Sequence, residues 1–174
     1  MNINAIVGDI TNYKVNIIVN AANKTLLGGG GVDGMIHRKA GKKLLEECKG
    51  LGGCETGEAK MTDAYNLPCD KIIHTVGPVY NGGNKNEDIL LHNAYKNSMV
   101  LAEQYRVDNN LDRISIAFPS ISTGVYRYPK EEACNIAIRT VKETNFSNID
   151  VYFVCYSIED YKIYINNLYK IDVK

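Results

Sequence analysis

The chain has 174 residues, a length that suits one domain and leaves little room for two. Lysine and arginine together number 20, as do aspartate and glutamate, so the formal net charge is zero. This balance argues against binding to a nucleic-acid backbone, because such binding usually depends on an excess of basic residues.

The five cysteines are odd in number and include no CxxC pair, which argues against a disulfide framework and against a zinc site. We expect reduced thiols, several of them buried as small apolar side chains. The segment Met1–Asn4 is not a basic stretch followed by a long apolar run, and nothing reaches the ~18 consecutive apolar residues of a membrane helix. The expectation is a cytoplasmic protein that does not bind membranes.

Short β-branched runs alternate with longer stretches of helical periodicity. In the first half of the chain, strands are predicted at residues 5–7, 15–19 and 72–76, and an alternating segment covers 57–62. Apolar residues at a spacing of four predict a single helical face over residues 33–48. The residues of that face are Ile36, Ala40, Leu44 and Cys48.

In the second half, Leu91, Tyr95, Met99 and Ala102 mark a long helix, and strands are predicted at 114–118 and 149–155. Pro129 precedes a helix that has two glutamates in its first turn. Ser157 and Asp160 resemble a capping pair for a final helix. The alternation predicts an α/β fold with helices on both faces of a mostly parallel sheet.

In such folds ligands bind where loops leave the carboxyl ends of the strands. Four successive glycines, Gly28–Gly31, follow one strand and lead into a helix, whose N-terminus favours phosphate. Glycines alone would equally suit a plain connector, and this segment matches neither GxGxxG nor GxxxxGK[ST]. A second loop, Ser120–Tyr126, offers hydroxyls, backbone donors and an aromatic ring. We predict that the two loops face each other and hold a pyrophosphate.

Several segments together resemble the macrodomain family, specifically its MacroD-type branch, and occur in the family's order over residues 8–130. The matching segments are GDIT at 8–11, NAAN at 20–23, GGGGVDGMIH at 28–37, TGEA at 56–59, HTVGP at 74–78, and FPSISTGVY at 118–126 with Tyr128-Pro129. The resemblance implies a three-layer αβα macrodomain fold with a central mixed sheet, formed by a single domain over residues 1–174. It also implies that ADP-ribose lies in a cleft at the edge of that sheet.

The resemblance further assigns roles to residues. Asp9 would accept a hydrogen bond from the adenine amino group, and the two loops would hold the phosphates through backbone N–H groups. The implied ligand-binding residues are Asp9, Ile10, Ala21, Gly30, Gly31, Val32, Ser122, Thr123, Gly124, Val125, Tyr126 (against the distal ribose) and Tyr156 (stacked on adenine). Asn23 and Asp33 match the catalytic positions near the distal ribose. An amide can orient a hydroxyl or a water there, and a carboxylate can accept a proton.

The implied activity is hydrolysis of mono-ADP-ribose esters on acidic side chains, together with deacetylation of O-acetyl-ADP-ribose. The implied partners are ADP-ribose, mono-ADP-ribosylated proteins and O-acetyl-ADP-ribose, with no cofactor and no metal. Zinc-dependent relatives use Cys and His ligands, and no dense cluster of these is present. Two alternatives stay open: a non-catalytic ADP-ribose reader, and an RNA-binding protein, which the zero net charge disfavours.

Three histidines and one arginine need separate interpretation. His74 lies in an apolar strand and is expected to be a core histidine with satisfied hydrogen bonds. His37 is expected to be structural, and His92 exposed. Arg127 stands where the family's second loop has its second glycine. If that position requires a positive φ, arginine is strained there by ~1–2 kcal/mol; alternatively, its guanidinium reaches a phosphate or the modified protein.

Overall fold

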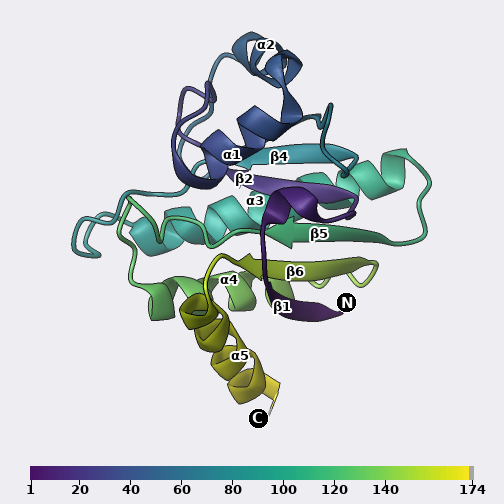
Figure 1. Ribbon diagram of the computed structural model, residues 1–174. Helices are drawn as coiled ribbons and strands as arrows, with labels where there is room; N and C mark the ends of the chain where they lie inside the picture. The colour runs from purple at the N-terminus through teal and green to yellow at the C-terminus, as the bar shows by residue number, and fades with distance from the viewer. Residues whose placement is uncertain (173–174) are drawn as a thin grey trace.

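The computed structural model describes residues 1–172, in which six strands form one sheet of order β1-β6-β5-β2-β4-β3 (Figure 1). The strands are β1 (Ile3–Val7), β2 (Ile17–Ala21), β3 (Ala59–Asp63), β4 (Lys71–Thr75), β5 (Ile114–Phe118) and β6 (Ile149–Cys155). All neighbouring strands are parallel except β3 and β4, which are antiparallel. The predicted mixed sheet is confirmed.

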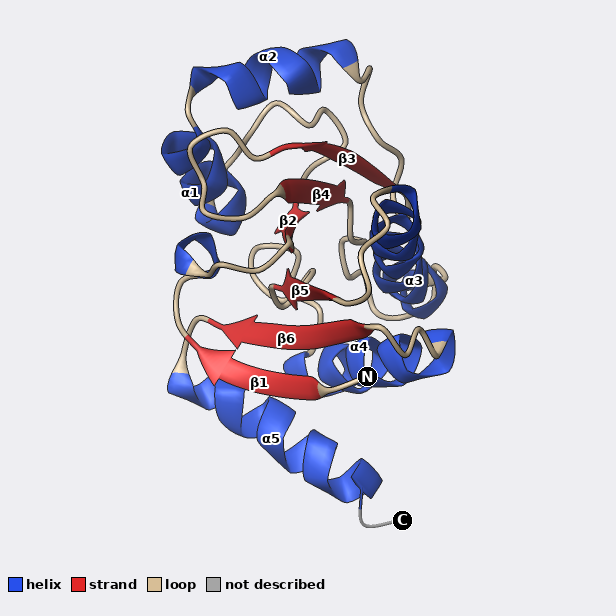
Figure 2. Cartoon of the chain, turned by 90° about the vertical axis from the view of Figure 1, so that its right-hand side faces the viewer, coloured by secondary structure: helices blue, strands red, loops and turns tan. Residues whose placement is uncertain are grey.

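Helices cover both faces of the sheet, with α1 and α3 on opposite sides of the central strands (Figure 2). The helices are η1 (Ile10–Asn12), α1 (Gly31–Ala40), α2 (Lys42–Gly50), α3 (Glu87–Asp108), α4 (Lys130–Thr144) and α5 (Ile158–Asp172). One apolar core lies between the sheet and α3, α4 and α5, and a second lies between the sheet and α1 and α2. Because the side chains of a strand alternate between faces, each central strand contributes to both cores.

The prediction of one helix over residues 33–48 is wrong, because the chain breaks at Gly41 into α1 and α2. Gly41 has a φ of 97°, and its N–H caps α1 by donating to the carbonyl of His37. A residue with a Cβ is strained at that φ, so glycine permits the turn. The four residues of the predicted face are nevertheless all buried, on two helices instead of one: Ile36, Ala40, Leu44 and Cys48.

Two other local predictions are confirmed, and the prediction for His92 is wrong. Pro129 caps α4, which has two glutamates in its first turn. The Ser157 hydroxyl accepts a hydrogen bond from the Asp160 N–H at 3.1 Å. His92, expected to be exposed, is half-buried, because its Nδ1 lies 2.9 Å from Oγ1 of Thr140 on the neighbouring α4.

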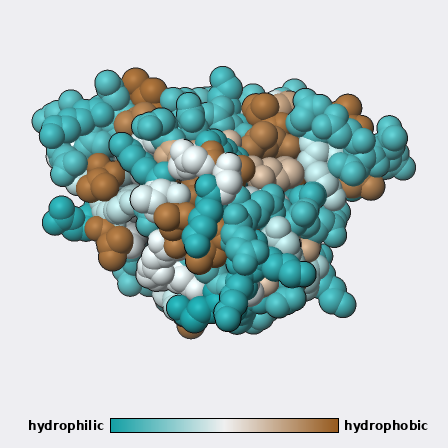
Figure 3. Space-filling model, turned by 90° about the horizontal axis from the view of Figure 1, so that it is seen from above, coloured by the Kyte–Doolittle hydropathy of each residue, from teal (hydrophilic) through white to brown (hydrophobic). Residues whose placement is uncertain are grey.

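All five cysteines are buried free thiols. Burial raises the pKa of Cys48 and of Cys69 to about 11, so these thiols are protonated near neutral pH. Within residues 1–172, no helix has both the length and the apolar character needed to cross a membrane. Seen from above, exposed hydrophobic residues form separate small groups on a mainly hydrophilic surface (Figure 3).

A buried carboxylate organises the polar loop before α3. Glu87 accepts hydrogen bonds from the backbone N–H groups of Asn81 at 2.8 Å, Gly83 at 2.9 Å and Lys85 at 2.5 Å. These bonds, the one from Asn81 above all, lower the pKa of Glu87 to about 2. This loop begins at Tyr80, whose N–H donates to the carbonyl of Tyr126. The hydrogen bonds of Glu87 therefore also support the predicted second loop, Ser120–Tyr126.

Because its pKa is lowered in the folded protein, Glu87 stabilises the fold above the ordinary carboxylate pKa of about 4.5. That contribution is lost as the pH falls toward about 2. We expect Glu87→Gln to lower the thermal midpoint at pH 7 and to reduce its further fall between pH 5 and pH 2.5, as measured by scanning calorimetry. The exposed Glu143→Gln is the control and should follow the native curve. If the thermal midpoints of native protein and Glu87→Gln fell by the same amount between pH 5 and pH 2.5, this role would be contradicted.

Candidate functional site

A cleft of about 530 Å³ lies at the carboxyl ends of β1, β2, β5 and β6. All the residues predicted from the sequence to bind the ligand or to act in catalysis lie in its wall. The cleft is also lined by Gly29, Ser120 and Ile121 of the two predicted loops. The lining residues outside the predicted site are Gly8, Ala22, Gly77, Pro119, Lys130, Val154 and Asp160. Among residues 1–172, no group of three or more His, Cys, Asp or Glu side chains is placed to hold a metal ion.

The glycine loop brings backbone close to the cleft. Gly30 is the N-cap of α1, and Gly31, its first residue, has a φ of 58°. The first N–H groups of a helix have no partner within that helix, and those of Gly31, Val32 and Asp33 belong to residues that line the cleft. Together with the partial positive charge of the helix N-terminus, they suit a phosphate.

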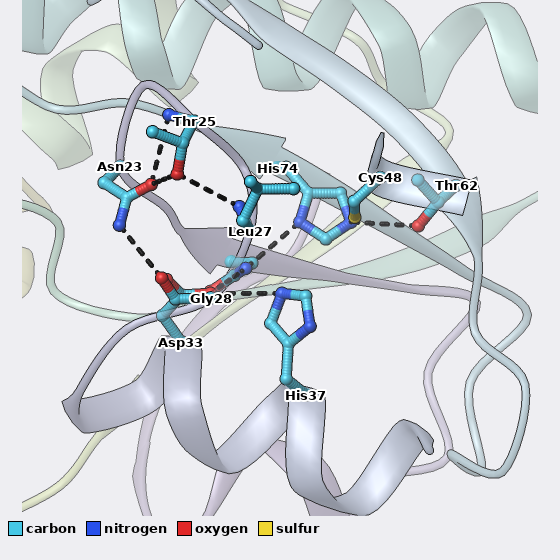
Figure 4. Close-up of polar contacts among 10 residues, drawn as sticks. Asn23, Thr25, Leu27, Gly28, Asp33, His37, Cys48, Thr62 and His74 are labelled. Carbon is cyan, nitrogen blue, oxygen red and sulfur yellow. Dashed lines mark hydrogen bonds and ion pairs between the residues drawn. The ribbon is translucent and has the colours of Figure 1, made fainter. Parts of the chain in front are cut away.

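Asn23 fastens this loop (Figure 4). Its Nδ2 donates to the carbonyl of Gly28 at 3.0 Å, and its Oδ1 accepts from the backbone N–H of Thr25 at 3.2 Å and from the Thr25 hydroxyl at 2.6 Å. A Cβ on Gly29 would lie 3.4 Å from Nδ2 of Asn23 and 3.2 Å from Oδ2 of Asp33. The loop therefore brings the amide and the carboxylate to the same glycine.

Asp33 is a buried carboxylate with 5% of its surface exposed. Its Oδ1 accepts a hydrogen bond from Nδ2 of Asn20 at 2.9 Å and lies 3.5 Å from Nε2 of His37. Burial raises the pKa of Asp33, although the hydrogen bond from Asn20 and the charge of His37 oppose that shift. A carboxylate with a raised pKa is a stronger general base than an ordinary aspartate.

Behind Asp33, a chain of buried polar groups crosses the sheet. Asn20 on β2 and His74 on β4 are register partners, and Nδ2 of Asn20 lies 3.0 Å from Nδ1 of His74. Nε2 of His74 lies 2.9 Å from Oγ1 of Thr62 on β3. Burial lowers the pKa of His74 to about 3, so the ring is neutral, and the expectation of a core histidine is confirmed. No role for Asn20 was predicted, although an amide inside an apolar strand is a signal that the sequence carries.

At the other end of the cleft, Asp9 follows β1 and caps η1. Its Oδ1 accepts from the N–H of Thr11 at 2.9 Å and from the Thr11 hydroxyl at 2.6 Å, and its Oδ2 pairs with Nζ of Lys39 at 2.8 Å. Burial opposes ionisation, but the hydrogen bonds from Lys39 and Thr11 outweigh it and lower the pKa of Asp9. Tyr156 is 69% exposed on the wall of the cleft and so leaves its ring free to stack on a ligand.

The second loop is supported from below by Tyr95 of α3. The Tyr95 hydroxyl accepts from the N–H of Ile121 at 3.2 Å and donates to the carbonyl of Pro119 at 3.4 Å. Ser122 and Arg127 both have positive φ, 69° and 61°. The conditional expectation of backbone strain at Arg127 is therefore met. The arginine side chain is exposed, and Arg127 does not line the cleft.

Because glycine adopts the φ of Arg127 without strain, Arg127→Gly should leave the free energy of unfolding unchanged or raise it by up to about 1 kcal/mol. We expect ADP-ribose affinity to stay within about tenfold of the native value, since the side chain lies outside the cleft. Urea unfolding and calorimetric titration measure the two quantities. Complete loss of ADP-ribose binding would instead identify Arg127 as a direct ligand contact.

Comparison with known proteins agrees with the cleft geometry. The model of the Macro domain family matches residues 19–137. A Macro domain-containing protein of Methanosarcina mazei is 55% identical, covering 89% of this chain and 81% of that protein. An O-acetyl-ADP-ribose deacetylase of Escherichia fergusonii is 49% identical, covering 93% and 92%.

The solved structures include a mutant of the Oceanobacillus iheyensis macrodomain with ADPR, which is 42% identical to this chain. That structure superposes with a TM-score of 0.88 and covers 99% of this chain and 93% of its own. The match to the family model, the relatives and the shared fold agree: this chain belongs to the Macro domain family.

Proposed function

We propose that this chain binds ADP-ribose and hydrolyses esters at its distal ribose. The substrates are mono-ADP-ribose linked to acidic side chains of proteins and O-acetyl-ADP-ribose. The observation that carries the proposal is the approach of Asn23 and Asp33 to the same glycine at the N-terminus of α1, inside the cleft. The relatives named as deacetylases and the ADPR-bound macrodomain support the same substrate class.

The ligand would extend along the cleft. Adenine lies at Asp9, beside the Ile10 backbone and under Tyr156, and the distal ribose lies against Tyr126. Between them the pyrophosphate is held by the backbone N–H groups of the two loops. The phosphate-binding residues in this assignment are Gly30, Gly31, Val32, Ser122, Thr123, Gly124 and Val125. Ala21, at the end of β2, contacts the ligand from the same wall of the cleft.

In hydrolysis, Asn23 orients a ribose hydroxyl or the attacking water, and Asp33 accepts the proton as the water oxygen forms its new bond. The ester C–O bond then breaks, Asp33 returns the proton to the leaving oxygen, and the products are ADP-ribose and a carboxylic acid. Attack at the anomeric carbon and attack at the acyl carbon give the same products. The N–H groups of the glycine loop offset negative charge that develops near the phosphates.

The proposal extends to the organisation and setting of the protein. Residues 1–174 form a single macrodomain, and the compartment is the cytoplasm, in keeping with five free, buried cysteines.

The test is single-turnover hydrolysis of a protein that carries glutamate-linked mono-ADP-ribose, by native chain and by Asn23→Ala/Asp33→Ala. We expect native protein to release ADP-ribose and the double variant to be slower by about 10²–10⁴-fold, the contribution typical of positioned acid–base groups. Calorimetric titration should show that both proteins still bind ADP-ribose.

The matched control is Asn84→Ala/Asp112→Ala, two exposed residues outside the cleft, and it should keep native turnover. Binding of ADP-ribose without release by native protein would make the chain a reader. Native turnover by the double variant would remove the catalytic roles of Asn23 and Asp33.

A further inference from the structure

The buried series of hydrogen bonds behind Asp33 has a direction, which is determined by which groups donate and which accept. The NH₂ group of Asn20 carries two hydrogens and lies 2.9 Å from Oδ1 of Asp33 and 3.0 Å from Nδ1 of His74. A carboxylate oxygen only accepts, so this side of the amide must be the donor. With one hydrogen for each neighbour, Nδ1 of His74 is an acceptor.

The tautomer of His74 follows. A neutral imidazole carries one hydrogen, so accepting at Nδ1 requires that hydrogen on Nε2. Nε2 lies 2.9 Å from Oγ1 of Thr62, which in turn donates to the carbonyl of Asp63 at 3.0 Å. Every donor in the series from Asp33 to Asp63 therefore meets an acceptor. Reversal at any one link would place two donors or two acceptors against each other.

We propose that His74 and Thr62 are positioning residues for hydrolysis, which hold the Asn20 amide with its NH₂ group toward Asp33 and so fix the orientation of that carboxylate. This inference rests on the hydrolase function proposed above. Neither His74 nor Thr62 lines the cleft, and their exposed fractions are 0% and 2%, so they act through Asn20. If the amide turned over, its oxygen would face both the carboxylate and the imidazole lone pair, and Asp33 would have to rotate away.

The first variant is Thr62→Val, which keeps nearly the same shape but removes the oxygen acceptor for Nε2–H and leaves only the weakly accepting Cys48 Sγ, at 4.0 Å. The tautomer with its hydrogen on Nδ1 is then favoured. Its Nδ1–H faces the NH₂ group of Asn20, and because two donors repel each other, the amide rotates to present its oxygen. We expect kcat to fall by about tenfold or more while the Kd for ADP-ribose stays within about threefold. Thr62→Ser restores the hydroxyl and should keep kcat within about threefold of native.

A Thr62→Val variant with native kcat would overturn the proposal. Equal losses of kcat and of ADP-ribose affinity would also overturn it, because they would indicate general loss of structure at the cleft. Should Thr62→Val fail to fold, His74→Asn and His74→Gln replace it. Asparagine places an acceptor near the position of Nδ1 and should keep more activity than glutamine, which reaches toward the position of Nε2. The opposite order would contradict the proposed direction.

A measurement without substrate separates this inference from the proposed function. Imidazole ¹⁵N chemical shifts of native protein should show His74 with its hydrogen on Nε2, and those of Thr62→Val should show it on Nδ1. A hydrogen on Nδ1 in native protein would overturn the inference even if the enzyme is active. Absence of native turnover would remove the proposed function and the catalytic consequence, while the shifts would still decide the direction of the chain.

Discussion

Replacing Gly34 with alanine should lower both the stability of the fold and its affinity for ADP-ribose. Gly34 is buried on α1, and a Cβ there would lie 2.4 Å from the carbonyl oxygen of Gly29. That oxygen belongs to the backbone of the glycine loop, so relief requires α1 or the loop to move. Overpacking of this kind typically costs about 1–3 kcal/mol. Because the displaced loop bears the N–H groups assigned to phosphate, we expect ADP-ribose to bind at least about tenfold more weakly.

Urea unfolding and calorimetric titration would measure the two effects. Gly50→Ala is the matched control, because Gly50 ends α2 and a Cβ there would meet nothing within 4 Å. It should leave affinity unchanged and alter stability by less than about 1 kcal/mol. If Gly34→Ala bound ADP-ribose with native affinity, α1 would be able to move away from the glycine loop without changing the cleft. The assigned phosphate contacts would then need revision.

Changing Asp9 to asparagine should alter which base the cleft prefers. The adenine amino group donates to the carboxylate in our assignment, whereas hypoxanthine presents a carbonyl oxygen at the same position. Hydrogen bonds to charged groups contribute about 1.5–3 kcal/mol, so Asp9→Asn should weaken ADP-ribose binding by about 10–100-fold. Asparagine can donate as well as accept, and the variant should bind inosine diphosphate ribose at least as well as native protein does.

The comparison requires affinities of both nucleotides for both proteins. Asp150→Asn is a suitable control, because Asp150 is also paired with a cation, Arg113, but lies outside the cleft. It should change neither affinity. An Asp9→Asn variant with unchanged preference for adenine would show that the base is recognised elsewhere, with Tyr156 and the Ile10 backbone as the nearest remaining contacts.

The sequence predicted the sheet better than it predicted the helices. The bounds of β5 and β6 agree with the predicted runs 114–118 and 149–155, because each of these buried parallel strands is a mainly apolar run, interrupted only by Ser115 and Asp150. The break at Gly41 escaped detection because the spacing of buried residues continues across it. Periodicity reports which side chains face the core, and this is unchanged when two short helices replace one long helix.

The site could be predicted only as far as local signals and family motifs extend. The glycine loop, the second loop and Asp9 were found because each carries a distinctive short pattern. The neighbours of Asn20 were not found, because His74 is 54 positions away and meets it only through the pairing of β2 with β4. The ion pair of Lys39 with Asp9 likewise depends on the packing of α1 beside η1, which no local pattern encodes.

The position of β1 in the sheet affects how the chain folds during its synthesis. β1 is the first strand to be made, but its neighbour in the sheet is β6, with Ile3 opposite Val151. Pairing across so much of the sequence carries a large loop-closure cost and slows folding. During synthesis β1 has no strand partner until residues 149–155 of β6 have emerged from the ribosome. The β1–β6 edge of the sheet is therefore expected to form last, when α5 can pack beside β1 and β6.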